Sequence, residues 1–222
     1  MLISLCTPCM NRLDDFKETI TSKINATKYG SVELVVLDYN SQDGLEDFVE
    51  NLMKTVPIVY KKYTGRNAYH AAHANNLVML LGNGDYVVLT PADTFIEEGY
   101  IPRLVKKIEQ GCIWCTTLKK HRSIVAVKKE EFVNCGGYDE RMEMYGPDDV
   151  DLIERLERRG GKFGSIPDEL IRSIYTSPEK KVENYRIKAS HKELGKLSMP
   201  YLYENRDKKS LVANLDGWGK WE

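Results

Sequence analysis

The sequence contains no uninterrupted run of about 18 apolar residues, the length that a helix needs to cross a membrane, so we expect no membrane span. The first residues, Met1 to Cys6, are too few and turn polar too quickly for a secretory signal peptide. A disordered chain is excluded as well, because 42% of the 222 residues are hydrophobic and a chain of this length buries a substantial core. We therefore expect a soluble, cytoplasmic, globular protein.

The sequence also lacks a strong charge of either sign. The net charge of −1 arises from 32 basic and 33 acidic residues and gives no strong nucleic-acid signature. Residues 179–222 hold 10 Lys or Arg and 7 Asp or Glu, a local charge of +3, so the remainder carries −4. This mild bias is typical of a solvated helix, and it leaves open contact with a phosphorylated, nucleic-acid or membrane-surface acceptor.

Cysteine is scarce, with five residues, four of which form two Cys-x-x-Cys pairs, Cys6/Cys9 and Cys112/Cys115. Such spacing occurs in zinc sites. The segment around Cys112 and Cys115, however, has the pattern of a strand, in which residues three apart point to opposite faces. We therefore expect buried free thiols rather than a zinc site or a disulfide.

Short apolar segments alternate with amphipathic ones along the first half of the chain. This β-α-β-α-β-α-β order predicts an α/β fold with a Rossmann-like, mostly parallel sheet flanked by helices. The expected strands and helices lie at 2–7, 13–26, 32–37, 45–55, 58–63, 68–81 and 85–89.

Polar side chains follow three of the predicted strands, and the carboxyl ends of such strands are where α/β sheets bind ligands. No glycine-rich phosphate loop accompanies them, so a nucleotide would be held by side chains and any bound cation. The same absence argues against a nucleotidyltransferase. The three loops contain Thr7-Pro8 with Asn11-Arg12, the run from Asp38 to Gly44, and Thr90-Pro91-Ala92-Asp93.

A cluster of acids marks the start of a later helix. The turn from Gly136 to Glu140 precedes Asp148 and Asp149, and an apolar stripe predicts a helix from these acids to just before Gly160. A helix start favours ionised acids, which can act as bases. Capping of the helix explains one such acid as well as catalysis does, so both interpretations stay open.

Together these segments resemble family-two glycosyltransferases of the GT-A fold, over roughly residues 1–170. The resemblance rests on Thr7-Pro8 with Asn11-Arg12, the Asp38-x-Asn40-Ser41-x-Asp43-Gly44 loop, His73-Ala74-Asn75-Asn76, Gly84-Asp85-Tyr86 leading to Asp93, and the late Gly-Gly-Tyr-Asp-Glu and Gly-Pro-Asp-Asp segments. The acidic helix start also resembles galactosyltransferase-type domains, which implies a hexose or N-acetylhexosamine donor.

The resemblance implies a role for each matching residue. Thr7 and Asp38 would line the nucleobase pocket, and Arg12 would approach the diphosphate. Asp149, or in second place Asp148, would be the general base. The remaining expected donor-site residues are Pro8, Asn40, Asp43 as support of its loop, Asn76 and Asp93.

The resemblance also implies a divalent cation, Mn²⁺ or Mg²⁺, bound to Asp93 and the diphosphate. Pro91 stands where the family has the first aspartate of its Asp-x-Asp motif, so the metal dependence is open. Mg²⁺ often keeps several waters and needs few protein ligands. His191 is the candidate for a later ligand, although a surface position on a basic helix is the preferred explanation.

The resemblance predicts a GT-A domain at 1–176 and a helical, aromatic C-terminal tail at 177–222 that packs on the site or closes over it. The expected activity is inverting transfer of a sugar from a nucleotide-sugar, UDP-hexose or UDP-N-acetylhexosamine, to a hydroxyl of a glycan, lipid-linked or other acceptor. The alternative is a noncatalytic module that binds nucleotide-sugar or glycan. The oligomeric state stays open.

Overall fold

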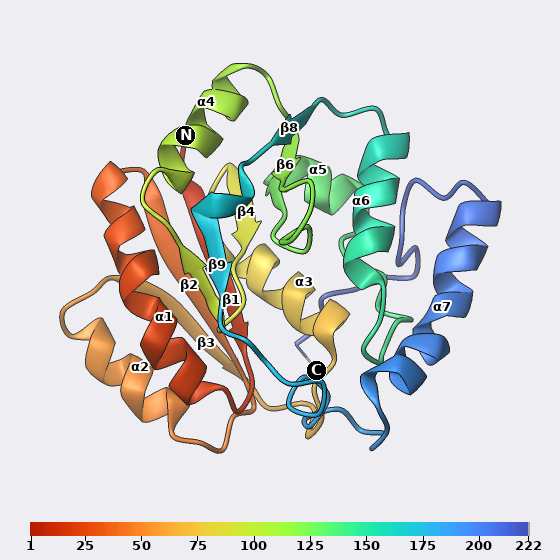
Figure 1. The fold of residues 1–222 in the computed structure, drawn as a ribbon, viewed down its shortest axis with the longest axis horizontal. Helices are drawn as coiled ribbons and strands as arrows, with labels where there is room; N and C mark the ends of the chain where they lie inside the picture. The colour runs from red at the N-terminus through yellow and green to blue at the C-terminus, as the bar shows by residue number, and fades with distance from the viewer. Residues whose placement is uncertain (222) are drawn as a thin grey trace.

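A mixed β-sheet with helices on both faces forms the centre of the protein, whose computed structural model describes residues 1–221 (Figure 1). Within these residues the main sheet has seven strands in the order β3-β2-β1-β4-β7-β6-β8. Four strand pairs are parallel and two, β4-β7 and β6-β7, are antiparallel, which confirms the mostly parallel sheet. The strands are β1 (Ile3–Cys9), β2 (Val32–Tyr39), β3 (Ile58–Tyr63), β4 (Tyr86–Leu89), β6 (Trp114–Thr116), β7 (Ala126–Lys128) and β8 (Phe163–Ser165).

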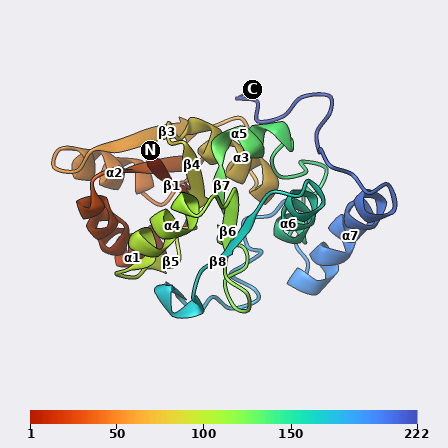
Figure 2. The ribbon, with the colours of Figure 1, turned by 90° about the horizontal axis from the view of Figure 1, so that it is seen from above.

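The helices form two layers because successive side chains of a strand point to opposite faces. In β1, Ile3 and Leu5 pack with α1, α2 and α4, whereas Cys6 packs with α3, α5 and α6 (Figure 2). A small second sheet pairs β5 with β9. The remaining elements are α1 (Leu13–Ala26), α2 (Leu45–Met53), α3 (Ala71–Leu81), β5 (Thr94–Ile96), α4 (Tyr100–Glu109), α5 (Lys129–Asn134), α6 (Asp148–Arg158), β9 (Ile171–Ser173), α7 (His191–Asp207) and the 3₁₀ turns Thr27–Tyr29 and Asp168–Leu170.

The C-terminal part lies against the outer side of α6 (Figure 1). Its helix, α7, begins with a capping box in which Ser190 and Glu193 each bond the other's backbone N–H. The segment before α7 is anchored by a small apolar cluster of Met144, Val182, Tyr185 and Leu194. Glu222, the last residue of the expected tail, lies outside the described residues. Over residues 1–221, no helix combines the length and the apolar character that crossing a membrane requires.

One sequence expectation about geometry is wrong. The thiols of Cys112 and Cys115 lie side by side, since both sulfurs face Gly164. A Cβ added to this glycine would stand 2.9 Å from the sulfur of Cys112 and 2.8 Å from that of Cys115. Cys112 precedes β6, so the chain there does not keep the alternation of a strand. All five cysteines are nevertheless free and buried, as expected.

Candidate active site

A cavity of about 480 Å³ lies at the carboxyl ends of β1 and β4. Three residues expected at a donor site line it, namely Pro8, Arg12 and Asp93. The loop at 120–124 and the segment at 173–185 form other parts of its wall. The position is the one that parallel-strand topology favours for ligand binding.

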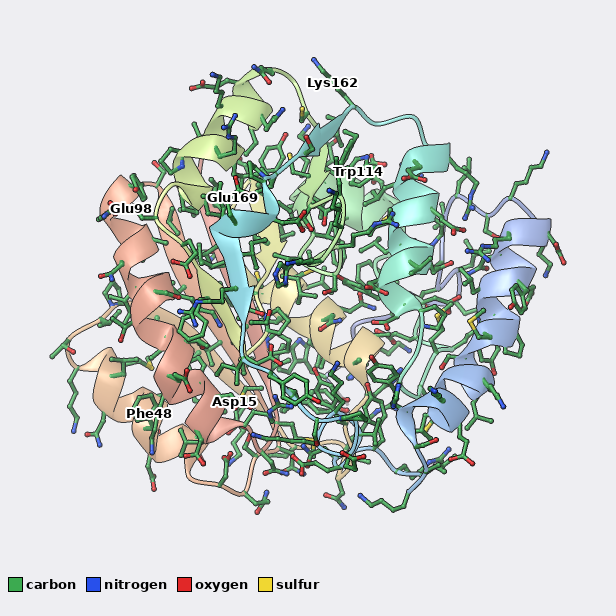
Figure 3. The ribbon with its side chains drawn as sticks, in the orientation of Figure 1. Asp15, Phe48, Glu98, Trp114, Lys162 and Glu169 are labelled. Carbon is green, nitrogen blue, oxygen red and sulfur yellow. The ribbon has the colours of Figure 1, made fainter. Side chains whose placement is uncertain are left out.

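Arg12 is the cation held most firmly in this cavity. It stands immediately before α1, and its guanidinium donates to Thr176 Oγ1 at 3.0 Å and to Asp93 Oδ2 at 3.3 Å. Its Nε donates to Asp15, a carboxylate on the first turn of α1 that is only 7% exposed (Figure 3). The same carboxylate accepts from Lys180 Nζ at 3.2 Å. Asp15 therefore fixes two cations at the cavity, one from each end of the chain.

Asp93 follows the strand that ends at Leu89, and β5 comes directly after it, so it does not cap a helix. Beneath this loop lies Lys23 of α1, which is 1% exposed and donates to the carbonyls of Thr90 and Pro91 at 3.1 and 2.9 Å. Burial lowers the pKa of Lys23 to about 7, against the opposing effect of Asp93. The loop that replaces Asp-x-Asp is thus supported by a buried amine.

Asp38, expected to contact a nucleobase, is the residue before the last one of β2, and its side chain is fully buried. One oxygen accepts from the backbone N–H of Ser41 at 2.7 Å, and the other accepts from the hydroxyl of Tyr60 at 3.2 Å. Thr7 is also buried, with its hydroxyl 3.1 Å from that of Thr90. Neither Asp38 nor Thr7 lines the cavity, although Thr7 directly precedes Pro8 and Cys9, which do, and Asp38 pairs with Cys9 in the sheet.

Three other expected donor residues hold backbone in place. Asp43 accepts from the N–H of Leu13 at 2.7 Å and so caps α1. Asn40 has a left-handed backbone with φ of 59° and donates to the carbonyl of Arg66. Asn76 accepts from the N–H of Tyr138 at 2.8 Å and donates to the carbonyl of the same residue at 2.9 Å, so it fixes the glycine turn before α6.

The acid pair stands on the first turn of α6, as the sequence indicates. Burial, together with the charge of Asp149, raises the pKa of Asp148, and burial raises the pKa of Asp149. A helix start favours the ionised form of such acids, but desolvation outweighs the dipole here. Asp149 keeps one oxygen bonded to the N–H of Val150 at 2.8 Å and feels the charge of Arg122.

Three tyrosines connect the acid pair to the cavity, since Tyr69, Tyr145 and Tyr185 all line it. Burial raises the pKa of each phenol, and the negative charge of Asp148 contributes to each rise. The two carboxylates therefore act electrostatically on the cavity wall without being part of it.

A buried ionic network that the sequence reasoning missed holds α6. Arg155 donates to Asp151 at 2.8 Å and to the carbonyls of Cys135 and Gly137 at 2.7 Å. Asn205 of α7 then donates to Asp151 at 2.8 Å and to Asp139 at 2.9 Å. The i, i+4 spacing of Asp151 and Arg155 was the available signal, but it also fits a solvated pair.

The residues that the structure offers to a divalent cation do not form a ligand set. Within residues 1–221, Asp93 is the only carboxylate lining the cavity, and no group of three or more His, Cys, Asp or Glu has the arrangement of a metal site. His191, the other candidate, is the first residue of α7 and packs against the ring of Tyr145 with centroids 6.0 Å apart, outside the cavity lining. The guanidinium of Arg12 already occupies one side of Asp93.

A family model and a curated relative are both similar to this chain in sequence. The model of the family "Glycosyl transferase family 2" matches residues 4–154. An abequosyltransferase, RfbV of Salmonella typhimurium, is 27% identical over 189 residues that cover 78% of this chain and 53% of the relative. The chain therefore spans about half the length of that curated relative.

Solved structures share the fold. TarS of S. aureus in complex with UDP has a TM-score of 0.67 at 13% identity and covers 97% of this chain and 76% of its own. Mannosyltransferase PcManGT of Pyrobaculum calidifontis, in complex with GDP-Man and Mn²⁺, has a TM-score of 0.61 at 21% identity and covers 75% and 55%. These likenesses confirm the expected GT-A type fold. The family model covers more than half of the chain and includes Arg12, Asp93 and the acid pair, so the chain belongs to glycosyl transferase family 2.

Proposed function

We propose that this chain is an inverting glycosyltransferase that moves a sugar from a nucleotide-sugar to an acceptor hydroxyl. The observation that carries the proposal is the acid pair Asp148-Asp149, held on a rigid helix start beside a cavity at the carboxyl ends of the strands. Burial raises the pKa of both carboxylates, and a carboxylate with a raised pKa is a stronger base than a solvated one, which a noncatalytic binding module does not need.

Asp149 is the proposed base, and Asp148 is the second candidate. The carboxylate takes the proton of the acceptor hydroxyl while the acceptor oxygen bonds to the anomeric carbon. The bond from that carbon to the diphosphate oxygen breaks, and its electron pair leaves with the nucleoside diphosphate. One displacement assisted by one base inverts the anomeric centre, by analogy with glycoside hydrolysis.

The proposed donor site follows the two strand ends. Arg12 and Asp93 meet the diphosphate and ribose in the cavity, and Asp38 and Thr7 support the nucleobase end from below. Asn76 has both its amide groups bonded to the turn at Tyr138, so we assign it to positioning of α6 rather than to the donor. No step of this mechanism uses a metal, because the described residues that line the cavity do not form a ligand set for one.

The similar proteins suggest which donors to test. Solved neighbours hold UDP, UDP-GlcNAc or GDP-Man, and the curated relative is named for abequose transfer. We propose UDP-hexose or UDP-N-acetylhexosamine as the first donors, with a glycan or lipid-linked hydroxyl as the acceptor. The cytoplasm is the proposed location.

The test measures release of nucleoside diphosphate from UDP-, GDP- and dTDP-sugars, with binding of each donor recorded in the same samples. We expect release from one donor, which Asp149→Asn slows by about 10² to 10⁴ without weakening donor binding. Asp148→Asn is the matched control, because it removes the neighbouring acid of the same turn. If Asp148→Asn alone stops release, the two roles are exchanged, and if no donor binds at all the proposal is wrong.

A further inference from the structure

The cavity has an unusual charge for a site that is expected to hold a metal. Within the described residues its lining contains four Lys or Arg side chains and one histidine against a single carboxylate, Asp93. A divalent cation prefers a surplus of carboxylates, whereas a diphosphate prefers the reverse. The four cations are Arg12, Lys120, Lys180 and Lys181.

Two of these cations are held in place rather than merely exposed. Arg12 is 15% exposed and Lys180 44% exposed, and both pair with the buried carboxylate of Asp15. Asp15 belongs to α1 and Lys180 to the segment before α7, so the pair joins parts of the chain 165 residues apart. A buried carboxylate shared between two cations fixes their positions at the cavity with little loss of side-chain freedom on binding.

The single cavity carboxylate is poorly placed to bind a divalent cation. Arg12 approaches Asp93 Oδ2 to 3.3 Å, and the hydroxyl of Thr176 lies 3.4 Å from the same oxygen. The carbonyl of Pro91, at the position of the missing aspartate, accepts from the buried amine of Lys23 at 2.9 Å. A cation bound here would meet a fixed guanidinium at close range, which Coulomb repulsion disfavours.

We propose that Arg12 and Lys180, fixed by Asp15, form a diphosphate site that does for the leaving group what a divalent cation does elsewhere. The inference rests on the proposed function and names how that site binds its donor. When the bond between the anomeric carbon and the diphosphate oxygen breaks, the electron pair stays on that oxygen, and the two cations neutralise the charge. Charge-assisted bonds to phosphate oxygens are among the strongest hydrogen bonds in proteins.

The test measures binding of UDP, GDP, dTDP and inorganic pyrophosphate to the full chain by calorimetry, once in EDTA and once with Mn²⁺. We expect at least one nucleoside diphosphate, and pyrophosphate more weakly, to bind in EDTA with a Kd within about threefold of that in Mn²⁺. Lys180→Gln should weaken this binding about tenfold, since one charge-assisted bond is worth roughly that factor. Lys180→Arg, which keeps the charge, should restore most of it.

Lys128→Gln is the matched control, because Lys128 is 43% exposed, pairs with one carboxylate and lies outside the cavity lining. It should leave the Kd unchanged. Binding that appears only with Mn²⁺ and is indifferent to Lys180→Gln would overturn this inference and leave the proposed function standing. Failure of every nucleotide to bind in either condition would overturn the proposed function, and this inference with it.

Discussion

The buried amine of Lys23 allows a prediction about stability that can be worked out from its surroundings. Its ammonium lies under the loop at 90–93, 1% exposed, with two backbone carbonyls as hydrogen-bond partners. Burial lowers its pKa from 10.5 to about 7. The perturbation is Lys23→Met, which keeps the length and volume of the side chain and removes the titrating group.

The sign follows from proton binding. Between about pH 7 and pH 10 the unfolded chain keeps the Lys23 proton that the folded chain has released, so the stability of the wild type rises with pH in this window. At 1.36 kcal/mol per pH unit, the window of about three pH units corresponds to roughly 4 kcal/mol. Lys23→Met should lack this rise of the free energy of unfolding with pH, even if the substitution also changes the stability by a constant amount.

The assay is urea unfolding of both proteins in steps of about one pH unit over that window, because linear extrapolation gives the free energy of unfolding at each pH. The difference between wild type and Lys23→Met should grow steadily with pH in favour of the wild type. Lys17→Met, which removes an exposed lysine of the same helix, is the control and should show a constant difference. Parallel curves for Lys23→Met would mean that the amine stays charged beneath the loop, and would refute the reasoning.

Three further predictions concern α6 and its supports. Asp149→Asn should raise the thermal midpoint at neutral pH while slowing transfer by about 10² to 10⁴. A carboxyl with a raised pKa stabilises the fold at low pH and loses that effect as pH rises through its folded pKa, and the amide does not titrate; an unchanged midpoint in calorimetry would count against it. Asn205→Leu should cost about 2–4 kcal/mol in urea unfolding, since two buried carboxylates lose a donor, and a loss below about 0.5 kcal/mol would contradict the network. Gly137→Ala should destabilise far more than Gly160→Ala in the same assay. Both glycines have a positive φ, so the backbone strain of the two variants is similar. A Cβ at Gly137 would also meet the side chain of Asn76 at 2.4 Å, whereas one at Gly160 would meet nothing within 4 Å. Equal losses of unfolding free energy in the two variants would contradict this prediction.

The first half of the fold could be predicted from sequence because its elements are long and strongly patterned. The helix at 13–26 and the strand at 58–63 have the predicted bounds, and the strand starting at Val32 extends two residues further, to Tyr39. The third helix begins at Ala71 rather than near residue 68, because His70 has an extended backbone with φ of −131°. After residue 110 the strands are only three residues long, too short for a two-residue period to stand out.

The site was predictable where it depends on position relative to strand ends. The cavity therefore contains Arg12 and Asp93, both named from sequence. Asp15 and Lys180 could not be found in this way, because their pairing joins residues far apart in the chain and each looks like an ordinary surface charge. The buried state of Arg155 was hidden for the same reason, since its partners include carbonyls of a turn about twenty residues earlier.

The segment after α7 has a consequence for how the protein is made. The side chain of Asn214 accepts from the backbone N–H of Glu140 at 2.9 Å. The side chain of Glu140 in turn accepts from the backbone N–H of Gly219 at 2.9 Å. These contacts secure the turn that leads into α6, yet they come from residues 74 and 79 positions later. On a ribosome, which synthesises the chain from its N-terminus, the sheet can form well before this turn is secured. The acid pair thus reaches its final setting only after residue 219 has emerged.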